Sequence, residues 1–507
     1  MTQRRGVAIL AGLALAACGK APGPDRELRV AVPYDLSSFD PHAKNGVGAY
    51  EVLSAVYEPL VTLDRSMRPV PALALSWETP DPLTWVFRLR PGVRFHDGSP
   101  LSAEDVAASL QRLLTDERLE MRSYLSGVAE VTARGPDTVV VRTLRPNAQL
   151  ASRLHFALVV PRGSNSDSLA KRANGTGPFA VAGWQPSSLA LQRNPLYWGE
   201  AAGASRVRID FGITAAEAVA AGDAAPYDLI VGARRAEEEA RRSGRYRVVE
   251  VENIFLRHLA FDVARERTPF CPGIPNPFRK PEVREAISLA LDRERLAAAA
   301  GAGAVPAYQL VPRAVFGHDP GLPPVVPDPA RARALLAQAG LAHGFDVVLH
   351  RPRGYSTAAE IVKEQLAAVG IRVRIESLPS AEFFDALDAR KLSFWIVASG
   401  CPTGDGIELL EASFHSPGPG GLGVDNYGDY RSPDLDRRIL EAGGLFDLRV
   451  RQAAVQGLLG QVLDDRVWIP LYHDRGALLL ARGLLYEPRA DGYLRVADLE
   501  PDPTASR

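Results

Sequence analysis

Helical and strand patterns alternate through the second half of the chain, and this alternation restricts the fold more than any other feature. Apolar residues recur at helical spacing in 281–301, 330–339 and 358–369, and short β-branched or aromatic runs occupy 345–350, 372–376 and 392–398. Such an order of elements is typical of an α/β lobe, in which helices cover a sheet.

The length of the chain requires more than this one lobe. A chain of 507 residues is too long for one core, so two or three domains are expected. The formal net charge is -1, with no basic tail and no basic patch with interleaved aromatics, so we expect no nucleic-acid partner. Glycine and proline are spread along the chain, and no short-period repeat is present.

The first residues have the pattern of an export signal. Arg4 and Arg5 precede an apolar run, 6–17, that is too short to cross a bilayer comfortably as a mature helix. The run ends in Leu15-Ala16-Ala17-Cys18, which resembles a bacterial lipobox, in which the cysteine carries lipid after cleavage. We therefore expect residues 1–18 to be a lipoprotein signal peptide with lipidation at Cys18. The alternative is an ordinary signal peptide with a chance cysteine.

The segment from Pro91 to Leu113 is unusually rich in turn signals. Pro91-Gly92 and Asp97-Gly98 are turn dipeptides, and Val93–His96 between them is predicted to form a short strand. Ser102 precedes a helical pattern and can accept a hydrogen bond from an unpaired backbone N–H, with Asp105 three residues later. These signals predict a strand–turn–helix unit.

Two cysteines, Cys271 and Cys401, remain after Cys18. In an oxidising compartment outside the cytoplasm, two such residues can form a disulfide. The alternative is a pair of separate buried thiols, and the sequence leaves both possibilities open.

Motifs of common enzymes are absent from the sequence. We find no GxSxG, P-loop or HExxH pattern, and the GxGxxA match at Gly175 is followed by strand-like residues rather than a Rossmann helix. The nine histidines form no helical pair with a nearby carboxylate of the kind that holds zinc. The sequence therefore predicts no catalytic residues, no cofactor and no metal site.

Six segments, in order along the chain, carry a resemblance to a known family. They are VYEPLV (56–61), PGVRFHDGSPLSAEDVAASLQRL (91–113), NGTGPFAVAGW followed by LQRNPLYWG (174–199), VREAISLALDRERL (283–296), DPARARALLAQAG (328–340) and QLAAVGIRVRI (365–375). Together they resemble the family 5 extracellular solute-binding proteins of ABC importers, the peptide- and nickel-binding type. The resemblance implies an α/β, two-lobed periplasmic-binding-protein-like fold, the large three-domain variant of type II, with hinge closure around the ligand.

The resemblance also implies a division into domains. The first lobe is expected from 27–62, 175–262 and 474–507, the satellite domain from 63–174, and the second lobe from 263–473. The chain would cross between lobes near Phe261-Asp262 and Tyr472-His473. The turn-rich segment at 91–113 then belongs to the satellite domain, and we assign no ligand contact to its histidine or aspartate.

Site residues follow from the same resemblance. In peptide binders of this family, an aspartate in the second-lobe loop binds the peptide's α-amino group; here its place falls on Pro402, within 399–414. Either Asp405 replaces that aspartate or Asp405 is the N-cap of the helix that follows it. The expected ligand-binding residues are Tyr34, Asp35, Ser37, Phe39, His155, Phe156, Ser399, Cys401, Thr403, Asp405, Asn426 and Tyr427.

The expected function is that of an extracytoplasmic solute-binding lipoprotein, not an enzyme. It would deliver a peptide or similar small solute to the permease of an ABC importer, as a monomer held on the membrane by its lipid, at the periplasm or cell surface. The alternatives are an exported sensor or receptor of the same fold without transport, and an exported hydrolase.

Overall fold

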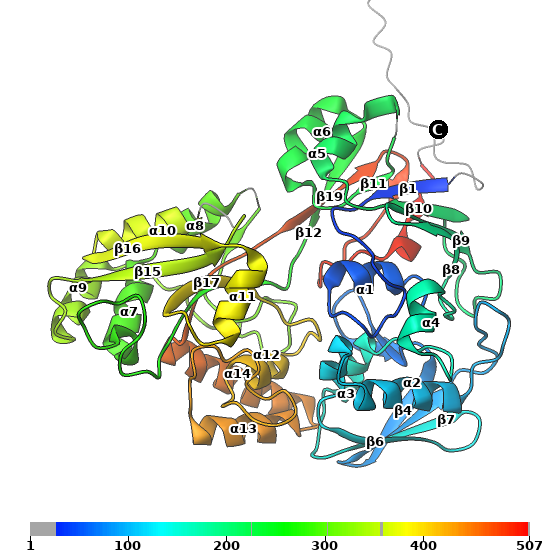
Figure 1. The fold of residues 1–507 in the computed structure, drawn as a ribbon, viewed down its shortest axis with the longest axis horizontal. Coiled ribbons are helices and arrows are strands. Elements are labelled where there is room, and N and C mark those ends of the chain that lie inside the picture. The colour runs from blue at the N-terminus through cyan, green and yellow to red at the C-terminus, as the bar shows by residue number, and fades with distance from the viewer. Residues whose placement is uncertain (1–26, 225, 302, 355–357, 505–507) are drawn as a thin grey trace, which may run out of the picture.

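The computed structural model describes residues 27–224, 226–301, 303–354 and 358–504, so Cys18 and the predicted signal peptide lie outside the described residues. Two large sheets occupy opposite sides of the molecule, and a third, smaller sheet lies below the first (Figure 1). Between residues 27 and 504, with the gaps just given, no helix has the length and apolar character needed to cross a membrane.

The first large sheet is assembled from distant parts of the chain. Its spatial order is β12-β19-β11-β1-β10-β9-β8, with β1 parallel to both β10 and β11. The strands are β1 (Glu27–Ala31), β8 (Phe179–Gln185), β9 (Ser188–Arg193), β10 (Arg206–Asp210), β11 (Leu229–Ile230), β12 (Tyr246–Val251) and β19 (Gly476–Ala481). Its helices are α1 (Val47–Leu53), α5 (Ala215–Ala220) and α6 (Glu237–Ser243). We call this unit the first lobe.

The small sheet forms the satellite domain. Its four antiparallel strands run in the order β4-β5-β7-β6, and helix α2 packs on β6 and β7. The elements are β2 (Val61–Leu63), β3 (Pro69–Pro71), β4 (Ala74–Asp81), β5 (Thr84–Leu89), α2 (Ala103–Thr115), η1 (Glu120–Leu125), β6 (Val128–Ala133), β7 (Thr138–Thr143), α3 (Leu150–Arg153), η2 (Leu154–Phe156) and α4 (Ser166–Lys171). One continuous hydrophobic core joins this domain to the first lobe, so the two are expected to move as one body.

In the turn-rich segment at 91–113, the predicted helix is confirmed and the predicted strand is not. Ser102 and Asp105 form a full capping box at the start of α2. The predicted strand at 93–96 is wrong: the tight turn at Asp97-Gly98 leaves room for one isolated bridge, between Arg94 and Pro100. The segment instead docks on the turn that precedes β8, where the backbone N–H of His96 donates to the Gly175 carbonyl at 2.9 Å.

The second large sheet has the order β14-β18-β13-β17-β15-β16 and defines the second lobe. Its strands are β13 (Leu256–Phe261), β14 (Val305–Pro306), β15 (Phe345–Pro352), β16 (Ile371–Leu378), β17 (Phe394–Ser399) and β18 (Trp468–His473). Its helices are α7 (Pro281–Ala290), α8 (Arg293–Ala300), α9 (Pro329–Gln338), α10 (Ala358–Ala367), α11 (Ser380–Asp388), α12 (Gly406–Ser413), α13 (Pro433–Gly443) and α14 (Leu448–Asp465). The helix expected over 281–301 is thus two helices, because Asp292 caps a new helix at Arg293.

Two crossings connect the lobes, and one differs from its expected position. Strand β12 belongs to the first lobe and β13 to the second, so the first crossing is 252–255 rather than Phe261-Asp262. The apolar run of β13 extends to Phe261 because that strand is buried between β17 and β18. The second crossing is Asp474-Arg475, directly after the expected Tyr472-His473.

Of the two possibilities left open for the cysteines, the disulfide is absent from this structure. Cys271 and Cys401 are both free and buried, and they belong to two different hydrophobic cores on the second-lobe sheet. The Cys401 thiol donates a hydrogen bond to the Asp405 carbonyl at 2.8 Å. The alternative of two separate buried thiols therefore holds.

The docking of the turn at Gly175 predicts a sharp sequence requirement. A Cβ atom at Gly175 would lie 2.0 Å from the Val56 carbonyl oxygen, whereas a Cβ at Gly183, in the strand β8 that follows, would meet nothing closer than 4.0 Å. We expect Gly175→Ala to lower the unfolding free energy by about 1–3 kcal/mol or more through overpacking. Gly183→Ala is the matched control. Equal unfolding midpoints in urea for both variants would contradict this packing.

Candidate functional site

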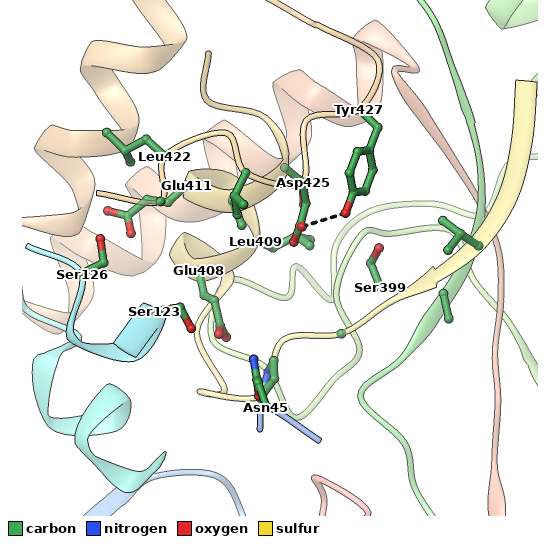
Figure 2. A pocket seen from close by; sticks show the side chains of 18 of the residues that line it. Asn45, Ser123, Ser126, Ser399, Glu408, Leu409, Glu411, Leu422, Asp425 and Tyr427 are labelled. Atoms are coloured by element: carbon green, nitrogen blue, oxygen red, sulfur yellow. Dashed lines mark hydrogen bonds between the residues drawn. The ribbon is translucent and has the colours of Figure 1, made fainter. Parts of the chain in front are cut away.

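A cleft of about 490 Å³ lies between the lobes, on the side where the satellite domain faces α12 (Figure 2). One wall comes from Asn45 and from the satellite residues Ser123, Tyr124, Ser126 and Arg153. The second lobe supplies the rest of the lining: Phe255, His258, Phe384, Trp395, Val397–Gly400, Pro402, Glu408, Leu409, Glu411–Ser413, Gly420–Leu422, Val424, Asp425, Tyr427 and Trp468. Its position between two hinged bodies is where a solute would be enclosed on closure.

Aromatic side chains from the second-lobe sheet line part of the cleft. The His258 ring stacks on Trp468 with centroids 3.7 Å apart, and its Nε2 lies 3.0 Å from the Ser399 hydroxyl. Complete burial lowers the pKa of His258 to about 3. The imidazole is therefore neutral at physiological pH, and it offers the cleft a polar group without a charge.

Helix α12 carries three acidic residues at intervals of three along the chain: Asp405, Glu408 and Glu411. Asp405 is the N-cap, and its carboxylate accepts from the Ile407 N–H at 3.1 Å. The same carboxylate forms a buried ion pair with Arg451 of α14. Asp405 therefore anchors the helix and does not line the cleft.

Glu408 lies one turn further on and lines the cleft (Figure 2). Thr403 holds its carboxylate from behind, with the backbone N–H at 3.0 Å and the hydroxyl at 2.6 Å. Burial raises the pKa of Glu408 above its ordinary value, and the Thr403 hydrogen bonds partly offset this rise. No ion pair reaches this carboxylate among the described residues.

Glu411, on the next turn, connects the second lobe to the satellite domain. Arg145 contacts one carboxylate oxygen at 2.9 Å, and Arg153 and Gln149 contact the other. Beside this bridge, the Ala148 N–H donates to the Gly443 carbonyl at 2.8 Å. These contacts close the cleft at its satellite end.

A further carboxylate, Asp425, lines the cleft outside α12. It is half-buried, and the Tyr427 hydroxyl donates to it at 3.2 Å (Figure 2). Burial raises the pKa of Asp425 above its ordinary value, and the hydrogen bond from Tyr427 opposes the rise.

The second-lobe residues expected at the site are in the right region, but few face the cleft. Ser399, Pro402 and Tyr427 line it. Cys401 and Thr403 are buried behind the lining, and the Asn426 amide binds the carbonyls of His415 and Tyr430. These buried side chains shape the loops that form the cleft.

The expected first-lobe and satellite residues do not line this cleft. Phe39 packs on Trp184, Tyr34 donates to Glu51, and Asp35 and Ser37 are exposed. His155 and Phe156 are buried, and His155 faces a separate cavity of about 90 Å³. Apart from the exposed Asp35 and Ser37, these side chains therefore pack within the first lobe and satellite domain.

Sequence reasoning missed Glu408, Glu411, Asp425 and His258. The interval of three residues from Asp405 to Glu411 was the available signal, because it places one carboxylate on each successive turn of the helix. Asp425 and His258 carry no comparable local signal. Within the described ranges, no group of three or more His, Cys, Asp or Glu side chains is arranged to hold a metal ion.

The role of Asp405 as an anchor can be tested directly. Asp405→Asn keeps a capping group but leaves the buried Arg451 guanidinium without its charged partner, so we expect a loss of about 3–5 kcal/mol in unfolding free energy. Adding Arg451→Met should restore much of that stability, because an apolar side chain needs no partner. If Asp405→Asn has the same unfolding free energy as wild type in chemical denaturation, the anchoring role is contradicted.

Comparisons with known proteins agree on the nature of the fold. A family model described as "Bacterial extracellular solute-binding proteins, family 5 Middle" matches residues 68–421. The chain is similar to the glutathione-binding protein GsiB of Pectobacterium atrosepticum, with 24% identity over 503 residues that cover 94% of each protein.

Solved structures align over nearly the whole chain. The ABC transporter substrate binding protein CtaP of Listeria monocytogenes aligns with 94% of this chain and 100% of its own, at a TM-score of 0.82 and 20% identity. The periplasmic binding protein DppA of Helicobacter pylori, in complex with the peptide STSA, aligns with 95% and 98%, at a TM-score of 0.78 and 20% identity. These likenesses confirm the two-lobed, type II fold expected from the sequence.

Proposed function

The chain belongs to family 5 of the bacterial extracellular solute-binding proteins, and we propose that its cleft holds a small solute through a protonated amine. It is the binding component of an ABC importer and not an enzyme. The solute would be a peptide or a similar amine-bearing compound, released to the permease when the lobes open.

The observation that carries this proposal is the setting of Glu408. Its carboxylate lines the cleft, is oriented by Thr403, and has no ion-pair partner among the described residues. An ionised carboxylate in a cleft that closes requires a cation, because an unpaired buried charge costs several kcal/mol. A protonated amine of the solute supplies that cation.

The remaining charges of the cleft favour the same class of solute. Arg153 is the one Lys or Arg side chain among the described lining residues, and it is already paired with Glu411. Carboxylate groups on a solute therefore meet no free cation there. The relatives include a protein named for glutathione and one solved with a peptide, and the charges here favour peptides with a free amine and few carboxylates.

Blocking the amine tests the proposal. We expect wild-type protein to bind Ala-Ala-Ala more tightly than N-acetyl-Ala-Ala-Ala in calorimetry. Glu408→Gln should weaken binding of the free peptide by about 2–5 kcal/mol and leave the acetylated peptide unchanged, because it removes one partner of a buried charge pair.

Glu382→Gln, at an exposed position of α11 that does not line the cleft, is the matched control and should bind both peptides as wild type does. The proposal fails if acetylation is without effect, or if Glu408→Gln and Glu382→Gln bind the free peptide equally.

We also propose that the protein is held at the membrane as a monomer by lipid on Cys18. The support is the Leu15-Ala16-Ala17-Cys18 sequence after the apolar run. Intact mass of detergent-extracted protein should show a diacylglyceryl-modified N-terminus. Cys18→Ala should release the protein into the soluble fraction, and an equally membrane-bound variant would refute the anchor.

A further inference from the structure

We infer that the cleft contains a second cation subsite at Asp425, so that the preferred solutes carry two separate cationic groups. A peptide with a Lys or Arg side chain and a diamine both have this chemistry. The inference rests on the proposed function in one respect: it takes Glu408 as the partner of the first amine.

The surroundings of Asp425 suit a cation. It lines the cleft and is half-buried, and the contact shown for its carboxylate is a neutral hydroxyl, that of Tyr427, at 3.2 Å. The described residues provide no ion pair to it, and its charged neighbour is another acid, Asp388. A negative group of this kind gains most from a cation brought in by a solute.

The two carboxylates form separate subsites. Glu408 projects from α12, whereas Asp425 lies in the loop that follows that helix, and Figure 2 shows them as distinct groups on one wall of the cleft. Their electrostatic neighbours also differ. Burial is the main cause that raises the pKa of each carboxyl. The nearby charges differ, because Arg153 lowers and Asp405 raises the pKa of Glu408, whereas Asp388 raises the pKa of Asp425. One ammonium is therefore not expected to satisfy both.

The aromatic rings of the cleft suit an organic cation. Tyr427, Trp395, Trp468 and Phe384 line the same cleft, and ammonium and guanidinium groups bind favourably over such rings. Tyr427 already accommodates one cation, since the Arg390 guanidinium carbon lies 5.6 Å from its ring centroid.

The lining includes one further group that points to a ligand. His258 is fully buried, and its Nδ1 has no hydrogen-bond partner within the described part of the chain. Because this imidazole is neutral, its unpaired ring nitrogen can donate a hydrogen bond to a solute or accept one, and the ring does not repel a cationic solute. A carboxylate, aromatic rings and a neutral imidazole together match the donors and apolar stem of a basic side chain.

The test compares solutes that differ in one charge. Lys-Ala-Ala, norleucyl-Ala-Ala and Arg-Ala-Ala are titrated into wild type, Asp425→Asn, and the control Asp388→Asn, which removes an exposed charge outside the lining. We expect wild type to bind the lysine peptide at least tenfold more tightly than its norleucine analogue. Asp425→Asn should reduce this ratio to about one, while Asp388→Asn should largely retain it.

Two further arms separate the sources of the cation and the two proposals. 1,5-Diaminopentane tests whether two amines alone are sufficient for binding. If the protein binds the lysine peptide but not the diamine, the site is one for peptides. Tyr427→Phe keeps the carboxylate and should keep the ratio. An unchanged lysine-to-norleucine ratio in Asp425→Asn overturns the inference, as does failure of every dicationic solute to bind. If instead acetylation has no effect but the ratio still collapses in Asp425→Asn, the first amine site fails and the second stands.

Discussion

The contact on which the binding cleft depends is the bridge from Glu411 to Arg145 and Arg153. It joins a helix of the second lobe to the satellite domain, across a boundary that two crossings of the chain and the Ala148–Gly443 hydrogen bond also span. Arg153 and Glu411 also line the cleft. Losing one partner of such a buried pair costs about 3–5 kcal/mol. The ion pair that holds the second lobe against the satellite domain therefore also contributes to the charge of the cleft.

Helix α12 divides its acidic residues among three tasks. Asp405 anchors the helix through Arg451, Glu408 lines the cleft, and Glu411 closes the cleft at its satellite end. The anchor matters because a ligand-binding carboxylate must be held by a rigid element to recognise an amine at a fixed position. The same division explains why Asp405, the acid that the sequence singled out, is not the one that lines the cleft.

Local patterns predicted much of the fold, and long-range contacts decided the rest. The alternation after Pro281 gave the sheet of the second lobe, and Ser102 gave the start of α2. The position of the first crossing depended on β13 pairing with distant strands, which no local pattern reveals. At the site, the roles of Asp405 and Glu411 depend on arginines that lie 46 and 266 residues away along the chain. The sequence therefore located the loop but not the role of each acid.

The most direct test of this account is the identity of the solute that the protein carries. Native mass spectrometry of protein purified from its host under mild conditions would release and identify the bound compound. The account predicts a peptide or similar small compound with a protonated amine, present on the wild type and lost from Glu408→Gln. Recovery of an anionic compound without an amine, bound equally to both proteins, would contradict it.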